Sequence, residues 1–207
     1  IKNMSLAPYE AQFEQLIVGL IDEQFGVHRH FIDPKHLAGL RNNLLQLRET
    51  GEMQPAGIGK STSYVKNTKV RGDVIKWIEP NSQDEHERLF LDKMEAFITY
   101  LNRSCYAGIS NYEFHYAYYE QGSFYKRHLD QFKIDNGRKY SFVLYLNENW
   151  NEETDGGNLA LYLNDGERKL YPNGGTAVFF KSDVLEHEVK PSHTRPRMSI
   201  AGWLKNK

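Results

Sequence analysis

Apolar residues recur at helical spacing in the first half of the chain, and this pattern predicts three helices. Residues 8–24 place a set of apolar side chains on one helical face, namely Phe13, Leu16, Ile17, Leu20 and Ile21. Asp33 followed by Pro34 is typical of a helix start, and the leucine-rich stretch that follows is expected to end near Gly51. Ser82 and Glu85 have the spacing of a capping box, which predicts a third helix with an apolar face running to residue 101.

From residue 111 onward the period becomes alternating, which predicts β-strands. The first strand carries aromatic residues on one face, at Tyr112, Phe114, Tyr116 and Tyr118. Further β-rich runs cover residues 138–146, 158–163, 175–181, 186–190 and 197–204, with turn-forming residues between them. Many short strands with regular turns favour a barrel or a two-sheet jelly roll. The chain is therefore expected to be one α+β domain, with helical support over residues 1–104 and a β core over residues 111–204.

Residues 51–70 contain prolines and glycines but no long apolar run, so they are expected to form a long loop. Loops of this length are uncommon in compact domains unless they serve a function. A short strand is predicted directly afterwards, at residues 74–78.

Composition narrows the function classes. The chain has 207 residues with 26 basic and 27 acidic side chains, a balance that lacks the basic excess typical of nucleic-acid binding. No apolar run approaches the ~18 residues needed to cross a bilayer, and no secretion signal is visible, so no membrane association is expected. The single cysteine, Cys105, excludes an internal disulfide and a cysteine-rich zinc site. It is expected to be a small buried thiol in a cytoplasmic protein.

The residues with the clearest chemical potential are two histidines and an aspartate. Side chains two positions apart in an extended segment point the same way, so His128 and Asp130 can reach one point. Alone, such a pair is more often a surface ion pair, but His187 stands at the start of a later predicted strand. Two histidines and one carboxylate leave metal positions open and suit non-haem Fe(II) oxygenases. Zinc hydrolases use a similar set, so the donors do not name the metal.

Arg197 adds an anion-binding group to this set. It begins the last predicted strand, and an antiparallel pairing with the strand of His187 would bring the guanidinium close to the metal ligands. A planar, permanently charged guanidinium can bind a carboxylate with paired hydrogen bonds. By itself Arg197 would be only a charged residue at a strand start, but the four residues together predict a metal site beside an anion-binding site.

The chain from residue 71 to residue 203 resembles the prolyl 4-hydroxylases of the 2-oxoglutarate oxygenase superfamily, especially the hypoxia-sensing animal enzymes and their bacterial relatives. The resemblance lies in residues 71–79, 124–130, 144–150, 155–157, 179–183, 187–191 and 197–203. It implies a double-stranded β-helix with Fe(II) held by His128, Asp130 and His187 and with 2-oxoglutarate bound by Arg197. It also implies that Tyr118 lines the 2-oxoglutarate pocket and that Tyr145 hydrogen-bonds the distal carboxylate.

The arginine stands one residue further from the second histidine than in the hypoxia-sensing enzymes, which makes Arg195 the alternative to Arg197. We prefer Arg197 because Ser199, Ala201 and Trp203 then fall into the strand register of the family.

The activity implied by the resemblance is hydroxylation of a prolyl residue at C4 in a protein substrate, with elongation factor Tu as the candidate. Fe(II), 2-oxoglutarate and O2 would take part, with ascorbate as a further reductant. The loop that ends at residue 73 is expected to close over the substrate, with Arg71, Asp73 and Trp77 at its hinge. The alternatives are the same chemistry on a lysyl residue, a ribosomal protein or a free amino acid, and a metal-binding jelly roll without catalytic activity.

Overall fold

The computed structural model describes residues 8–57, 70–131 and 137–206. Within these ranges the chain forms helices and strands in the following order: α1 (Glu10–Glu23), β1 (Phe25–His28), α2 (Pro34–Glu49), β2 (Gln54–Pro55), β3 (Asp73–Trp77), α3 (Glu85–Cys105), β4 (Asn111–Tyr119), β5 (Tyr125–His128), β6 (Arg138–Tyr145), β7 (Leu159–Leu163), β8 (Gly166–Leu170), β9 (Ala177–Lys181), β10 (His187–Val189) and β11 (Arg197–Lys205).

The strands form two antiparallel sheets. The large sheet has the order β1-β9-β6-β11-β4-β3-β2, and the small sheet has the order β5-β10-β7-β8. Strands β4, β6, β9 and β11 thus belong to the large sheet, and β5, β7, β8 and β10 belong to the small one. Two facing sheets of four such strands make a jelly roll, or double-stranded β-helix. The predicted α+β class with a jelly-roll core and supporting helices is therefore confirmed.

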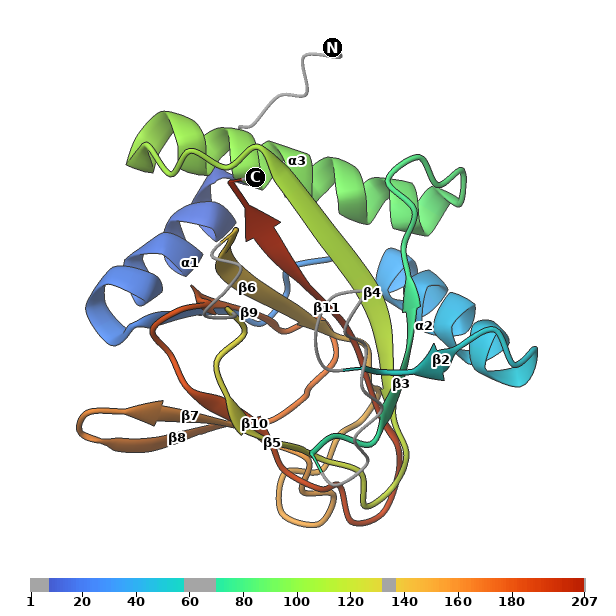
Figure 1. Ribbon diagram of the computed structural model, residues 1–207. Helices are drawn as coiled ribbons and strands as arrows, with labels where there is room; N and C mark the ends of the chain where they lie inside the picture. The colour runs from blue at the N-terminus through green and yellow to red at the C-terminus, as the bar shows by residue number, and fades with distance from the viewer. Residues whose placement is uncertain (1–7, 58–69, 132–136, 207) are drawn as a thin grey trace.

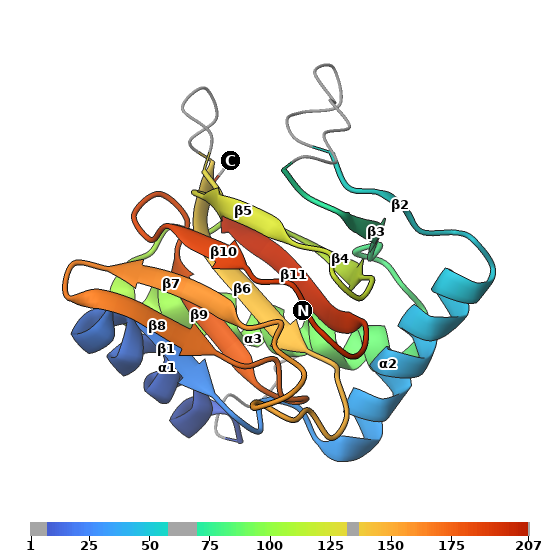
Figure 2. The ribbon, with the colours of Figure 1, turned by 90° about the horizontal axis from the view of Figure 1, so that it is seen from below.

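The large sheet is the middle layer of the molecule. Helices α1, α2 and α3 lie along one of its faces, and the small sheet lies on the other (Figures 1 and 2). The helices and the sheet share an apolar core that includes Phe13, Leu40, Phe97, Phe114 and Phe142. A second cluster fills the space between the two sheets and includes Ala117, Tyr119, Leu161, Phe180 and Val189.

Alternation along β4 assigns its residues to these two cores. Phe114 and Tyr116 point to the helices, whereas Ala117 and Tyr119 point to the small sheet.

The three predicted helices are present, but one predicted cap is wrong. Asp84, not Ser82, caps α3, because its carboxylate accepts hydrogen bonds from the amide nitrogens of His86 and Glu87. An acidic cap also interacts favourably with the helix dipole. The hydroxyl of Ser82 donates to the Glu87 carboxylate instead, at 2.6 Å.

Several further expectations are corrected. Strands β1, β2 and β8 were not predicted, and the helical N-terminal part of the chain contributes β1 to the edge of the large sheet through pairing with β9. Cys105 is exposed at the end of α3 and not buried. Most of the predicted loop, residues 58–69, lies outside the described residues. No helix in the described ranges is long and apolar enough to cross a membrane.

Candidate active site

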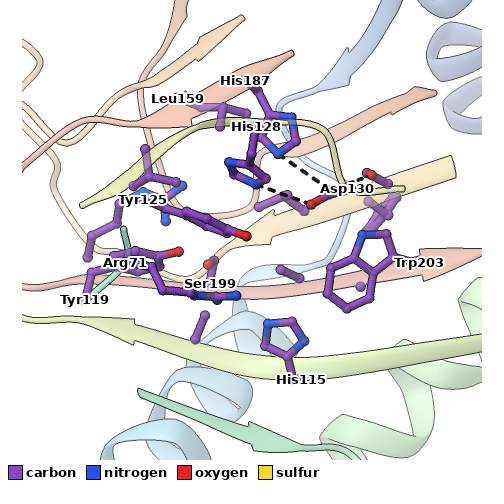
Figure 3. Close-up of a pocket in the computed structure, with 18 residues that line it drawn as sticks. Arg71, His115, Tyr119, Tyr125, His128, Asp130, Leu159, His187, Ser199 and Trp203 are labelled. Atoms are coloured by element: carbon purple, nitrogen blue, oxygen red, sulfur yellow. Dashed lines mark hydrogen bonds and ion pairs between the residues drawn. The ribbon is translucent and has the colours of Figure 1, made fainter. Parts of the chain in front are cut away.

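Three side chains with metal-binding groups converge between the two sheets (Figure 3). His128 ends β5, Asp130 follows it, and His187 begins β10. The pairing of β5 with β10 sets His128 directly opposite His187, so the two imidazoles are cross-strand neighbours. The register then shifts between His187 and Val189, an irregularity of the kind that re-aims side chains next to functional sites. One ligand atom from each of the three residues lies within 4.8 Å of the others.

Backbone carbonyls orient both imidazoles. The Nδ1 atom of His128 lies 2.6 Å from the carbonyl oxygen of Lys126, and that of His187 lies 3.1 Å from the carbonyl oxygen of Leu185. A carbonyl oxygen can only accept, so Nδ1 carries the proton and Nε2 presents its lone pair to the centre of the site. The two Nε2 atoms lie 3.4 and 3.5 Å from the carboxylate oxygens of Asp130.

The Asp130 carboxylate is oriented and kept charged by its neighbours. Ser141 Oγ donates to it at 2.6 Å, and the Ser141 and Ser182 hydroxyls lie 2.8 Å apart. Burial alone would raise the pKa of Asp130, but His187, His128 and Ser141 hold that pKa well below its usual range. Burial lowers the pKa of His187 to about 4, against the opposing effect of Asp130. At neutral pH the site therefore holds a carboxylate and a neutral imidazole, the forms that bind a divalent cation.

The donor set fits Fe(II). Two imidazole nitrogens and one carboxylate oxygen on one side of a metal leave the remaining positions free, as in the non-haem Fe(II) oxygenases. Ser141 and Ser182 were not anticipated, because no sequence spacing connects them to Asp130.

Arg197 lies in the wall of the same cavity. Its side chain is only 3% exposed, and the described residues supply no acidic partner for it. Nη2 lies 3.4 Å from the Tyr145 hydroxyl, and the guanidinium carbon lies 5.1 and 4.9 Å from the ring centres of Tyr119 and Tyr145. The Nε atom is buried and has no hydrogen-bond partner within the part of the chain that the structure describes. Burying a cation is costly unless an anion accompanies it, so this end of the cavity fits an anionic group.

The expected strand pairing around Arg197 is wrong. β10 and β11 are not neighbours, because β10 lies in the small sheet and β11 lies between β6 and β4 in the large one. His187 and Arg197 therefore line the cavity from different sheets. The alternative arginine, Arg195, is not among the residues of the cavity; it donates to the backbone oxygen of Asn149 and lies over the ring of Trp150.

The two tyrosines predicted from the resemblance have different places. Tyr145 is fully buried beside Arg197, as expected. Tyr118 does not line the cavity: it packs against the core under the helices, with Arg48 of α2 over its ring. Tyr119 lines the cavity instead, because neighbouring residues of a strand point to opposite faces. The prediction for Tyr118 is therefore corrected to Tyr119.

One side of the cavity is held by an ion pair that includes two of the predicted loop residues. Arg71 donates to both carboxylate oxygens of Asp73, at 2.7 and 2.6 Å. Burial opposes the charge of Arg71, but these hydrogen bonds keep its pKa above the usual range. The guanidinium lies 4.3 Å from the ring centre of Tyr125, and that ring stacks on His128 at 3.5 Å. Tyr125 lay in a matching segment but was given no role from the sequence.

The third predicted loop residue, Trp77, is 45% exposed at the end of β3. Arg71 lines the cavity, Asp73 holds Arg71, and Trp77 packs against a cavity residue, His115.

Comparisons with known proteins agree with this geometry. Residues 114–205 match the model of the 2OG-Fe(II) oxygenase superfamily. The crystal structure of a Pseudomonas putida prolyl-4-hydroxylase is 33% identical, with a TM-score of 0.84, and the match covers 94% of this chain and 99% of that one. A Trichoplax adhaerens prolyl hydroxylase in complex with a hypoxia inducible factor peptide is 25% identical, with a TM-score of 0.87 and coverage of 100% and 94%.

Curated relatives are longer than this chain. Egl nine homolog 1 of Rattus norvegicus is 30% identical over 169 residues, and hypoxia-inducible factor prolyl hydroxylase of Caenorhabditis elegans is 26% identical over 207 residues. The alignments cover 76% and 94% of this chain but only 48% and 28% of the relatives. The P. putida enzyme, in contrast, is matched over nearly its whole length. With its jelly roll, its convergent metal-binding residues and this match, the chain belongs to the 2OG-Fe(II) oxygenase superfamily.

Proposed function

We propose that this chain hydroxylates a prolyl residue at C4 in a protein substrate, using Fe(II), 2-oxoglutarate and O2. One observation carries the proposal: a three-residue metal-binding set lines the same cavity as a buried arginine that has no counter-ion among the described residues. The metal-binding set can hold a metal and leave coordination positions open, and the arginine can bind the far carboxylate of a dicarboxylic acid.

Each residue has a role in binding or orientation. When bound, Fe(II) with 2-oxoglutarate and O2 supplies the oxidising chemistry, which converts 2-oxoglutarate to succinate and CO2. His128, Asp130 and His187 would hold the ion, with Ser141 fixing the direction of the carboxylate. Arg197 would pair with the far carboxylate, and the Tyr145 hydroxyl beside it would donate to the same group.

The substrate class rests on the relatives. The P. putida relative is a prolyl-4-hydroxylase, and the T. adhaerens relative is complexed with a peptide of hypoxia inducible factor. Both support an extended protein segment that contains proline. Elongation factor Tu is the narrower candidate, and it rests only on the resemblance to bacterial enzymes. Arg71 and Asp73 would support the cavity wall beside Tyr125, next to this segment.

The test has two stages. Anaerobic addition of Fe(II) and 2-oxoglutarate should produce a weak visible charge-transfer band. In air, peptides that contain proline, starting with peptides from elongation factor Tu, should then be scored for succinate release and for the gain of one oxygen atom by mass spectrometry. Matched peptides with lysine in place of proline separate the prolyl from the lysyl reaction.

Asp130→Ala should abolish both the band and turnover, because it removes one of three metal ligands. Asp165→Ala is the control, since this exposed acid of the β7–β8 hairpin pairs with Arg168 and lies outside the metal-binding set. Full activity of Asp130→Ala would show that the metal site is assigned wrongly. A wild-type protein that gives neither band nor succinate would favour a jelly roll without catalytic activity.

A further inference from the structure

The cavity wall between Arg197 and the metal centre consists of paired residues of β4 and β11. Three pairs follow one another and all line the cavity: Arg197 with Tyr119, Ser199 with Ala117, and Ala201 with His115. The cavity wall between Arg197 and His115 carries only small side chains, which leave space above the strands: Ser199, Ala117 and Ala201. Arg197 and His115 stand four positions apart along the paired strands, so their Cα atoms are separated by about 13 Å along the strand direction, at roughly 3.3 Å per residue. The wall therefore forms a trough with a hydrogen-bonding side chain at each end.

His115 is a buried imidazole with unused hydrogen-bonding capacity. It is 3% exposed, and among the described residues its Nδ1 atom has no hydrogen-bond partner. Figure 3 shows its ring rising from β4 into the space beneath Asp130 and beside Trp203. The rings of Trp77 and Trp203 lie 4.9 and 5.5 Å from it, between centroids. Burial lowers the pKa of His115 to about 3, so the ring is neutral and retains one N–H donor.

Among the described residues, three buried polar atoms without a hydrogen-bond partner belong to side chains that line this one cavity. They are His115 Nδ1, Arg197 Nε and Trp203 Nε1. Native proteins satisfy nearly all buried polar groups, and exceptions that cluster call for an explanation. A ligand with polar atoms at both ends would give partners to Arg197 and His115 at once, whereas a purely structural role for His115 leaves its nitrogen unexplained.

We propose that His115 binds the keto-acid end of 2-oxoglutarate, donating a hydrogen bond to the carboxylate there. This assignment rests on the proposed function. With the far carboxylate at Arg197, the keto-acid end points along the trough toward the metal centre, and His115 lies beneath Asp130 on this side of the cavity (Figure 3). Arg197 and His115 then hold the two ends of one ligand, and Ala117, Ser199 and Ala201 leave room for its carbon chain.

The test is a titration of 2-oxoglutarate into the full chain loaded with Mn(II) under nitrogen, followed by calorimetry. His115→Leu should weaken 2-oxoglutarate binding about tenfold to a hundredfold, the range for a hydrogen bond to a charged group, and leave the Mn(II) affinity unchanged. The analogue 2-oxopentanoate lacks the far carboxylate but keeps the keto-acid end. Its affinity should fall by the same factor in the variant.

The matched control is His86→Leu. His86 also has a buried Nδ1 atom that finds no partner among the described residues, but it stands in the first turn of α3 and is not among the residues of the cavity. Its substitution should leave 2-oxoglutarate binding unchanged. His115→Gln keeps an N–H donor and should retain most of the affinity, and it decides the question if the leucine variant does not fold.

Three results would overturn the assignment: unchanged 2-oxoglutarate affinity in His115→Leu, a loss for 2-oxoglutarate but not for 2-oxopentanoate, or an equal loss of Mn(II) affinity. The second would place His115 at the far carboxylate, and the third would show a general distortion of the site. A wild-type protein that binds no 2-oxoglutarate would instead refute the proposed function, and the assignment with it.

Discussion

Replacing Arg197 by methionine should weaken 2-oxoglutarate binding and yet stabilise the empty protein. In the ligand-free structure the guanidinium is buried, and its Nε atom has no hydrogen-bond partner in residues 8–57, 70–131 and 137–206. Its contact with the Tyr145 hydroxyl is long, at 3.4 Å. A buried cation without an anion destabilises the fold, so an apolar side chain of similar length removes that cost. With 2-oxoglutarate bound, the same substitution leaves the far carboxylate buried and unpaired.

The magnitudes follow from these two situations. Removing one partner of a buried charge pair costs about 3–5 kcal/mol, and each 1.4 kcal/mol corresponds to a factor of about ten. The Kd for 2-oxoglutarate should therefore rise by roughly 100-fold to 4000-fold. The ligand-free variant should gain about 1–3 kcal/mol of unfolding free energy, the cost of an unsatisfied buried group. Weaker 2-oxoglutarate binding together with higher stability indicates a lost binding contact, whereas general damage to the fold would lower both binding and stability.

Calorimetric titration of the Mn(II)-loaded protein gives the Kd, and urea unfolding of the metal-free protein gives the stability. Arg195→Met is the matched control, because Arg195 is not among the residues of the cavity; it donates to the backbone oxygen of Asn149 and lies over the ring of Trp150. It should leave both quantities nearly unchanged. If Arg197→Met lowers stability and binds 2-oxoglutarate as tightly as wild type, the reasoning about a buried cation that awaits its anion is refuted.

Three further predictions concern the metal ligands, the pH dependence and the packing. Ser141→Ala removes the hydroxyl that orients Asp130, so calorimetry should find metal affinity lower by about 10-fold to 100-fold; equal affinities would contradict that role. Acidification from pH 7 to pH 4 should destabilise the metal-free protein. In the unfolded chain His115 takes up a proton near its ordinary pKa of 6.5, whereas in the folded protein the His115 imidazole stays neutral until about pH 3. Urea unfolding should show a loss of unfolding free energy of up to about 3 kcal/mol in the wild type and a smaller loss in His115→Leu. If the unfolding free energies of the two proteins fall in parallel with pH, His115 is not a buried neutral histidine. Gly26→Ala should lower the unfolding free energy by about 1–3 kcal/mol or more, since a Cβ there would lie 2.0 Å from the Leu16 carbonyl oxygen; an unchanged thermal midpoint would show that the β1–α1 contact yields easily.

Hydrophobic periodicity predicted the parts of the fold in which one face of an element is buried. The helices and strands β4, β6, β7, β9 and β11 all have such a face, and the pattern located them. Strand β8 is different: it lies at the edge of the small sheet, pairs only with β7 and carries charged residues at Glu167, Arg168 and Lys169. Its conformation comes from pairing and not from its own composition, so a local pattern could not show it.

The alternation of side chains along β4 separates Tyr118 from the cavity. The alternation of Tyr118 with Phe114 and Tyr116 already placed it on the face toward the helices, and that periodicity was the better guide than the family match. The same alternation puts His115 on the opposite face of a strand rich in aromatic residues, which was the available signal for a buried polar residue. Ser141 gave no signal, because its contact with Asp130 depends on how two strands from different sheets approach each other.

The hydrogen bond from Ser141 to Asp130 joins the metal site to both sheets of the jelly roll. His128 and His187 belong to the small sheet, whereas the hydroxyl that holds the Asp130 carboxylate belongs to β6 of the large one. An ion shared by all three side chains would cross-link the two layers of the jelly roll at their inner surface. Loading and release of the ion would thus change the cohesion between the layers, even though the helices on the far side of the large sheet never touch it.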